Sequence, residues 1–327
     1  MNHQNSQPLW QPSVKTVNAS NMLRFMQQLK RELGLAFEDY QQLHQWSVAY
    51  PQQFWQQVWL FSEIRSSKQA DKVLSDGEKF PGAKWFSGAR LNYAENALRN
   101  RTDKTALISR LEDGSRRTLS YAQLYQQVAE CAAALRQHGV VAGDRVAGFM
   151  PNIPETVVAM LATASIGAIW SSCSPDFGIN GVMDRFGQIE PKVLFCCEGC
   201  FYNGKTIDCM PRLQQITSNI SSIQQLVVVA VTCQQPVINE ADFATSALLY
   251  NDFLVAENTP ELVFEQLPFD HPLYIMYSSG TTGEPKCIVH SAGGILIQHL
   301  KEQQLHTDLH ADDVLFYFTT CGWMMWN

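Results

Sequence analysis

The chain has 327 residues, of which 46% are hydrophobic and 17% are charged, and its formal net charge is −7. This composition is typical of a globular protein with one large domain or two ordinary ones, and it excludes a disordered or fibrous chain. The acidic balance argues against nucleic acid as a partner, because phosphate backbones are bound by clustered Lys and Arg. A local pocket could still bind an anionic substrate.

The sequence shows no sign of export or of a membrane partner. The N-terminal segment MNHQNSQPLWQPS has neither the basic start nor the apolar core of a signal peptide. The longest apolar stretch, 157–170, is interrupted by Thr163, Ser165 and Gly167, and it is shorter than the ~20 residues that span a bilayer. We therefore expect a cytoplasmic protein whose nine cysteines are reduced thiols.

Residues 1–90 are predicted to form a helical leader. Apolar residues recur at helical spacing from Asn21 to Leu33, and Gly34 predicts the end of that helix. A second helical pattern over 37–60 is interrupted at Pro51. We expect this leader to pack its aromatic side chains on a larger α/β body over 91–327.

From about Leu91 onward, strand patterns alternate with helix patterns. Two β-rich runs, 105–108 and 117–119, flank Asp113-Gly114 and predict a hairpin. Helices are predicted at 121–138, 154–166 and 182–189, and strands at 145–150, 168–171, 192–197, 226–231 and 273–277, with a last strand-like run at 314–319. The alternation predicts an α/β domain with a mostly parallel sheet. Because domains rarely end just after such a run, we expect a truncated chain.

The most informative segment follows the apolar strand at 273–277 and reads Ser278-Ser279-Gly280-Thr281-Thr282-Gly283-Glu284-Pro285-Lys286. Its glycines allow a tight turn that presents N–H groups, its four hydroxyls add donors, and its lysine adds a positive charge. These properties predict a phosphate-binding loop, although the spacing is not that of a Walker A motif. The alternative is a generic Ser/Thr/Gly turn, which nine ordered positions after a buried strand disfavour.

This loop resembles the signature aromatic-(S/T)-(S/T)-G-(S/T)-T-G-x-P-K of the adenylate-forming superfamily, to which acyl-CoA synthetases belong. The resemblance implies part of the large N-terminal domain of that fold. It also implies that the ATP phosphates are bound by Ser278, Ser279, Gly280, Thr281, Thr282, Gly283 and Lys286. Of these residues, Thr282 and Lys286 are the ones we assign to catalysis.

Three other segments resemble one branch of the superfamily. WFSGARLNYAENAL at 85–98 is similar to a segment of short-chain acyl-CoA synthetases, and 174–195 and 319–327 resemble acetoacetyl-CoA synthetases. The resemblance implies that acetoacetate and CoA are joined through an acyl-adenylate, with ATP as co-substrate and Mg²⁺ as cofactor. Another short acid, such as acetate or propionate, is an alternative.

The same resemblance implies two further contacts. Gly322 and Trp323 fall in the acyl pocket, where a rigid indole would limit the length of the acid. Lys205 aligns with a basic stretch that contacts CoA in acetyl-CoA synthetases, although Tyr202 replaces the first arginine there. For Lys205, a solvated surface lysine is the alternative interpretation.

Several other polar residues have less specific patterns. Asp184 and Arg185 are interpreted as structural residues on a helix, and His290 either lines the site or is a buried structural histidine. Cysteines at 196, 197, 200 and 209 could suggest a metal, but no second close pair follows them. His306 and His310 lack a third ligand and are interpreted as part of a solvated helix end.

The rest of the catalytic set is expected beyond residue 327. In the family, the Mg²⁺ ligand, the ribose-binding Asp and a small mobile C-terminal domain with a catalytic Lys all follow later in the sequence. We therefore expect this chain alone to have little or no ligase activity. The rival hypotheses are a non-catalytic fragment and an unrelated nucleotide-binding protein.

Overall fold

The structure is a computed structural model that describes residues 9–254, 261–278 and 283–327. The chain divides into two compact units. The first, here called the helical unit, comprises Met1–Ile64, Lys72–Trp85 and Ile295–Phe316. The second, here called the sheet unit, comprises Arg65–Asp71, Phe86–Gly294 and Tyr317–Asn327.

The helical unit begins with four helices, α1 (Val14–Ala19), α2 (Asn21–Leu33), α3 (Tyr40–Ala49) and α4 (Pro51–Phe61). The predicted helix end at Gly34 and the predicted interruption at Pro51 are confirmed. The hydroxyl of Ser20 caps α2 by accepting the N–H of Leu23 at 3.2 Å. Gly34 ends the helix with φ 70°, a conformation that suits glycine. Pro51 opens α4 at a position where its missing N–H costs nothing.

Aromatic rings form the core of the helical unit. Phe25 is fully buried on α2 and meets the rings of Phe54 and Phe61 edge-on, at centroid distances of 6.1 and 5.3 Å. Trp46 of α3 approaches Phe54 in the same way at 6.2 Å. These contacts explain the aromatic content of the predicted leader. The unit also holds β1 (Lys72–Ser75) and a π-helical turn, η2 (Glu302–His306), which follows α11 (Ala292–Lys301).

A seven-stranded sheet organises the sheet unit, with strand order β12-β11-β8-β6-β7-β14-β15. All neighbours are parallel except β14 and β15, which confirms the predicted mostly parallel sheet. The strands are β6 (Arg145–Phe149), β7 (Ile169–Cys173), β8 (Val193–Cys197), β11 (Gln225–Val229), β12 (Ser246–Leu249), β14 (Pro272–Ser278) and β15 (Lys286–Ser291).

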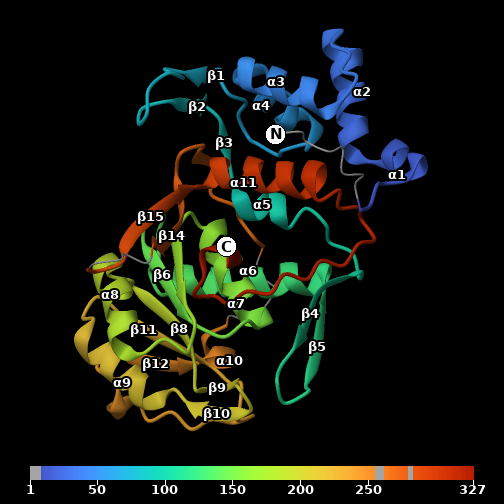
Figure 1. Cartoon of the computed structure of the whole chain (residues 1–327). Coiled ribbons are helices and arrows are strands. Elements are labelled where there is room, and N and C mark those ends of the chain that lie inside the picture. The colour runs from blue at the N-terminus through green and yellow to red at the C-terminus, as the bar shows by residue number, and fades with distance from the viewer. Residues whose placement is uncertain (1–8, 255–260, 279–282) are drawn as a thin grey trace, which may run out of the picture. The chain divides into compact units, whose positions relative to one another are not determined.

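Helices cover both faces of this sheet (Figure 1). Side chains of α8 (Ile179–Ile189) and α9 (Met210–Asn219) form one buried cluster with alternate residues of β6, β8 and β11. The other face carries α6 (Tyr121–Gln137), α7 (Pro154–Ser165) and α10 (Tyr250–Phe253). Because both faces are covered, the central strands are buried along their whole length, as their apolar sequences predict.

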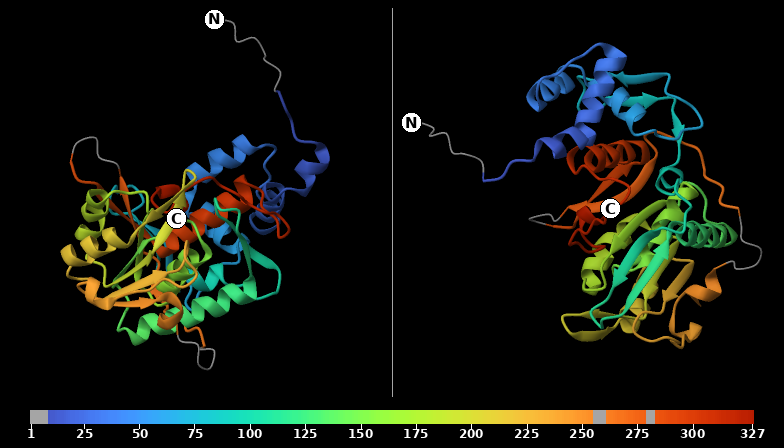
Figure 2. Two further views of the ribbon diagram at one scale, coloured as in Figure 1. Left: turned by 90° about the horizontal axis from the view of Figure 1, so that it is seen from below. Right: turned by 90° about the vertical axis from the view of Figure 1, so that its right-hand side faces the viewer.

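Smaller elements complete the unit. The predicted hairpin is confirmed as β4 (Thr105–Arg110) and β5 (Arg116–Ser120), which lie alongside α6 (Figure 2). Two-stranded sheets of this unit are formed by β3 (Arg90–Leu91) with β13 (Leu267–Pro268), and by β9 (Gly199–Tyr202) with β10 (Lys205–Asp208). A further two-stranded sheet is formed by β1, which belongs to the helical unit, with β2 (Lys84–Ser87). The remaining helices are α5 (Tyr93–Ala97), η1 (Glu240–Asp242) and η3 (Met324–Trp326).

The prediction of a strand at 314–319 is wrong. This run has no regular secondary structure, and its apolar side chains are exposed, with Phe316 at 83% and Phe318 at 76% of full exposure. A strand requires backbone partners on a neighbouring strand, and no described strand pairs with this run. Apolar composition alone was therefore insufficient for a strand.

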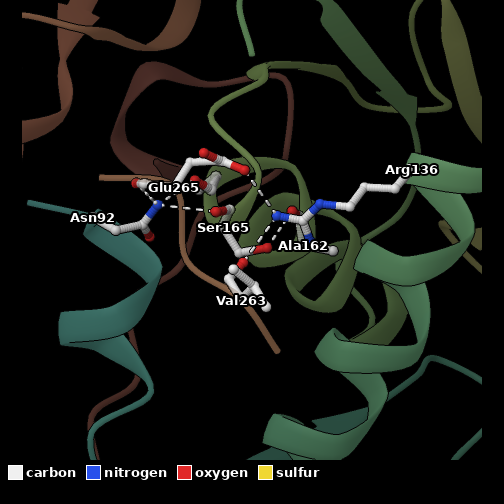
Figure 3. A network of polar contacts seen from close by, with 7 residues as sticks. Asn92, Arg136, Ala162, Ser165, Val263 and Glu265 are labelled. Atoms are coloured by element: carbon white, nitrogen blue, oxygen red, sulfur yellow. Dashed lines mark hydrogen bonds and ion pairs between the residues drawn. The ribbon is translucent and has the colours of Figure 1, made fainter. Parts of the chain in front are cut away.

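A buried asparagine connects three segments of the sheet unit (Figure 3). The Asn92 side chain is fully buried, and its amide donates to the carbonyls of Ala164, Ser165 and Glu265 at 3.0, 3.1 and 2.9 Å. Its Oδ1 caps α5 by accepting the N–H of Glu95 at 3.2 Å. Both polar atoms of the Asn92 side chain, Nδ2 and Oδ1, therefore form hydrogen bonds within the protein.

Candidate functional site

The carboxyl ends of the parallel strands form the candidate site. From β6 the chain moves to β7 on one side and then returns to β8 on the other side. In open α/β sheets, ligands bind at the carboxyl edge near such a change of direction. At this edge we find the loops after β6 and β7, the end of β14 at Ser278, and the C-terminal segment 319–326.

Three hydrogen bonds hold these pieces together. The N–H of Met150 donates to the Cys173 carbonyl at 3.1 Å, which joins the ends of β6 and β7. The Ser172 hydroxyl donates to the carbonyl of Cys321 at 2.8 Å. The indole of Trp326 donates to the side chain of Asn152 at 2.9 Å. The segment that resembles acetoacetyl-CoA synthetases therefore lies on the same edge as the strand ends.

The predicted phosphate-binding loop connects β14 with β15. The two strands pair with Ser278 opposite Lys286, so these two residues form the base of the loop. Gly283 has φ 110°, a conformation that favours glycine. Lys286 is exposed and makes no ion pair with a described residue. Ser279, Gly280, Thr281 and Thr282 lie outside the described residues.

Helix α8 contacts the far end of this loop. The amide of Gln188 donates to the carbonyl of Pro285 at 2.9 Å, and the thiol of Cys287 donates to Gln188 Oε1 at 3.5 Å. Both contacts are made by residues that the sequence did not single out. The donor set at the described ends of the loop, a hydroxyl, a lysine and a glycine of left-handed conformation, suits a phosphate group.

Gly322 lies against the loop that follows β7. A Cβ added at this glycine would come within 2.8 Å of the Phe177 ring and 3.2 Å of the Ser174 nitrogen. Only glycine therefore fits there without displacement of a neighbour. The adjacent Trp323 is 48% exposed, which leaves much of its indole available to a ligand.

Lys205 follows a two-residue turn between β9 and β10. Asn203 and Gly204 have φ 51° and 69°, as expected for an Asn-Gly hairpin turn. The carboxylate of Glu112 accepts both of their N–H groups, at 3.2 and 2.9 Å. Lys205 itself is exposed and makes no ion pair with the described part of the chain.

The cysteine-rich segment is buried. The sulfur atoms of Cys197 and Cys209 lie 3.9 Å apart, and the hydrogen bond between the two thiols is the largest cause of the raised pKa of Cys209, about 12. Glu198 between them is buried and accepts the N–H groups of Val231, Thr232 and Cys233 at 2.8, 2.6 and 2.7 Å. This carboxylate thereby fixes the loop after β11. Among the described residues, no group of three or more His, Cys, Asp or Glu could hold a metal ion.

His290 lies on β15, beyond the loop. Its Nδ1 is buried and has no hydrogen-bond partner in the part of the chain that is described. Burial lowers the pKa of this imidazole. A neutral ring is therefore favoured at this position.

Comparisons with known proteins agree with this geometry. The AMP-binding enzyme family matches residues 94–326, and the acetyl-coenzyme A synthetase N-terminus matches residues 40–97. The chain belongs to the family of AMP-binding enzymes. None of the helices in its described part combines the length and the apolar character that a membrane crossing requires.

Individual relatives indicate the branch of this family that the chain resembles. Acetoacetyl-CoA synthetase of Xenopus tropicalis is 46% identical over 98% of this chain and 48% of its own length. Acetoacetyl-coenzyme A synthetase of Rhizobium meliloti is 46% identical over 99% of this chain and 49% of its own length. A malonamoyl-CoA synthetase of Penicillium aethiopicum is 40% identical over 98% of this chain and 45% of its own length.

A solved structure supports the same relationship. Acetoacetyl-CoA synthetase from Streptomyces lividans matches with a TM-score of 0.92 and 42% identity, over 98% of this chain and 49% of that chain. The fold is therefore that of the N-terminal part of an adenylate-forming enzyme. The chain spans about half the length of the curated relatives that it matches.

Proposed function

We propose that this chain supplies the phosphate-binding part of an ATP-dependent ligase that joins acetoacetate to CoA. The observation that carries this proposal is the β14–β15 hairpin, where Ser278 faces Lys286 at the carboxyl edge of a parallel sheet. The similarity to acetoacetyl-CoA synthetases over nearly the whole chain supports it.

The names of the relatives also indicate a substrate class. Acetoacetate and malonamate, the acids implied by the two enzyme names, share a carbonyl group two carbons away from the carboxylate carbon. Relatives of both kinds match this chain over 98% of its length. We therefore propose a short acid with a carbonyl at this position, with acetoacetate preferred over acetate or propionate.

In the proposed reaction, the carboxylate attacks the α-phosphorus of ATP and pyrophosphate leaves. The sulfur of CoA then attacks the acyl carbon of the adenylate, and AMP leaves. Neither step requires a covalent bond to the protein, so the protein acts by positioning and by neutralising charge. We assign phosphate binding to residues 278–283 and Lys286, with Thr282 and Lys286 as the catalytic pair.

The remaining contacts follow from the same reaction. Lys205 would bind a phosphate of CoA, and Gly322 and Trp323 would enclose the acyl group. Bound Mg²⁺ would neutralise phosphate charge, but the described residues contain no ligand cluster for it. We further propose a cytoplasmic location, and a division into a leader at 1–90 and a catalytic body from 91.

Complementation in trans tests the proposal. Because the chain spans about half the length of its relatives, it should be mixed with the remaining half of the Rhizobium meliloti enzyme. AMP and acyl-CoA should then be measured with acetoacetate, malonamate, acetate and butyrate. We expect turnover only with both polypeptides, fastest with acetoacetate, and none with Lys286→Ala. Robust turnover by the chain alone, or a preference for acetate, would contradict the proposal.

A further inference from the structure

Arg185 of α8 lies over two aromatic rings, those of Phe177 and Tyr277. The central carbon of its guanidinium is 4.8 Å from the centroid of the Phe177 ring and 5.5 Å from that of Tyr277. Phe177 is the ring against which Gly322 lies. Tyr277 directly precedes Ser278, where the phosphate-binding loop begins. Arg185 is therefore next to the segments that carry both the predicted acyl pocket and the predicted phosphate site.

The guanidinium has unused hydrogen-bonding capacity. Among the described residues it donates once, to the carbonyl of Gly181 at 2.7 Å, whereas a guanidinium has five N–H donors. No carboxylate of a described residue is within ion-pair distance of it. The side chain is nonetheless partly buried. A partly buried cation without a counter-ion is unfavourable unless a ligand provides the negative charge.

Neighbouring arginines behave differently. Arg212 of α9 donates to the carbonyls of Pro175 and Phe177. Arg145 of β6 donates to the carbonyls of Ile189 and Glu190, at 2.7 and 3.1 Å. Each of these two arginines ties two backbone oxygens and thereby has a structural role. In the part of the chain that the structure describes, Arg185 makes a single hydrogen bond, within its own helix, so the same explanation does not account for it.

We propose that Arg185 is a second cation of the site, which binds phosphate oxygens of the nucleotide beside Ser278. This inference rests on the proposed function. The planar guanidinium can bind two phosphate oxygens at once, and the two aromatic rings orient it. Lys286 supplies the other positive charge from β15. The sequence alone led to a structural interpretation of Arg185, because a helix position does not reveal which rings and loops surround it.

Binding to the 327-residue chain tests the inference. Isothermal titration calorimetry at one fixed salt concentration should compare ATP with adenosine, for the unchanged chain and for Arg185→Gln, Arg185→Lys and Lys286→Ala. Arg116→Gln, which removes an exposed charge on β5, is the matched control. The thermal unfolding midpoint of each variant reports on its fold.

We expect Arg185→Gln to weaken ATP binding by about five- to tenfold, since one charge-assisted contact to phosphate is lost. Adenosine binding and the unfolding midpoint should not change, Arg185→Lys should be intermediate, and Arg116→Gln should bind ATP normally. Equal losses of ATP and adenosine would show a structural role and overturn the inference.

Two further outcomes separate the inference from the proposed function. If Lys286→Ala weakens ATP binding and Arg185→Gln does not, the inference is wrong and the proposed function stands. If the unchanged chain does not bind ATP at all, both are overturned.

Discussion

Two polar regions of the sheet unit use their hydrogen-bonding groups in opposite ways. At Asn92, the side-chain amide reaches three carbonyls and the carbonyl oxygen caps a helix, so the protein satisfies the whole side chain (Figure 3). At the carboxyl edge, and counting described residues alone, Arg185 makes one hydrogen bond and Lys286 makes no ion pair. The first region stabilises the fold, and the second retains capacity for a ligand.

This difference distinguishes polar groups that stabilise the fold from polar groups that bind a ligand, which composition alone cannot do. A polar group whose partners are all in its own chain contributes to stability, and its loss leaves buried groups unsatisfied. A cation without a protein partner contributes little to stability, and its loss should affect binding. Substitutions in the two regions should therefore separate into stability effects and binding effects.

The largest stability effect is expected for Asn92→Ala. The substitution removes the amide that donates to the carbonyls of Ala164, Ser165 and Glu265, and it removes the cap of α5. The carbonyls of Ala164 and Ser165 keep backbone donors, the N–H of Gly167 at 3.2 Å and that of Glu265 at 2.9 Å. We expect a loss of about 3 kcal/mol in the free energy of unfolding. Urea unfolding followed by tryptophan fluorescence measures it. Asn219→Ala, an exposed asparagine on α9, is the control and should change little.

A smaller loss is expected for Glu198→Gln. The substitution keeps the shape of the side chain, but the three N–H groups of Val231, Thr232 and Cys233 lose a charged acceptor. We expect a loss of about 2 kcal/mol, the scale of hydrogen bonds to a buried charged group. The same urea experiment applies, with exposed Glu78→Gln as the control. An unchanged unfolding midpoint for Glu198→Gln would mean that the carboxylate does not hold the loop after β11.

A third effect depends on pH. Burial lowers the pKa of His290, and its Nδ1 has no partner among the described residues. The unfolded chain therefore binds a proton at this site more readily than the folded protein. Its stabilising contribution is complete above the unfolded pKa of about 6.5 and is lost as the pH falls below it.

His290→Gln removes this titration. We expect the free energy of unfolding of the variant to fall less steeply than that of the unchanged chain as the pH is lowered from about 7 to 5. Denaturant unfolding at several pH values measures both slopes. The unchanged chain, measured in the same buffers, is the reference. Identical slopes for His290→Gln and the unchanged chain would contradict the expectation.

Local signals in the sequence predicted much of the fold. Gly34 and Gly114 allow a positive φ and Pro51 fixes φ, so these residues predicted the end of one helix, the turn of a hairpin and the start of another helix from their own positions. From 121 to 197, the change between helical and strand periodicity predicted the order of the elements, whereas β9, β10 and α9 were not predicted. These features are determined by residues close together in the chain, so one sequence is sufficient to predict them.

Features that depend on distant partners were missed. The run at 314–319 has the composition of a strand, but a strand also needs a paired neighbour, and local composition does not supply one. Arg185 meets Phe177 and Tyr277, and Gln188 meets Pro285, only because α8 packs at the carboxyl edge. The resemblance predicted the phosphate-binding loop, but the residues of α8 around it required the structure.

Gln188→Ala should give the smallest stability change and therefore the sharpest test of the comparison. The Gln188 side chain is exposed, so its loss should change the free energy of unfolding by less than about 0.5 kcal/mol. Its hydrogen bond to the Pro285 carbonyl nevertheless restrains the end of the phosphate-binding loop. We expect ATP binding to weaken by roughly threefold, because an unrestrained loop must be ordered on binding, while adenosine binding stays the same. Gln215→Ala, exposed on α9, should alter neither ligand's affinity. If Gln188→Ala instead lowers stability and leaves ATP affinity unchanged, α8 supports the fold and not the loop, and the division between structural and ligand-binding polar groups does not hold at this helix.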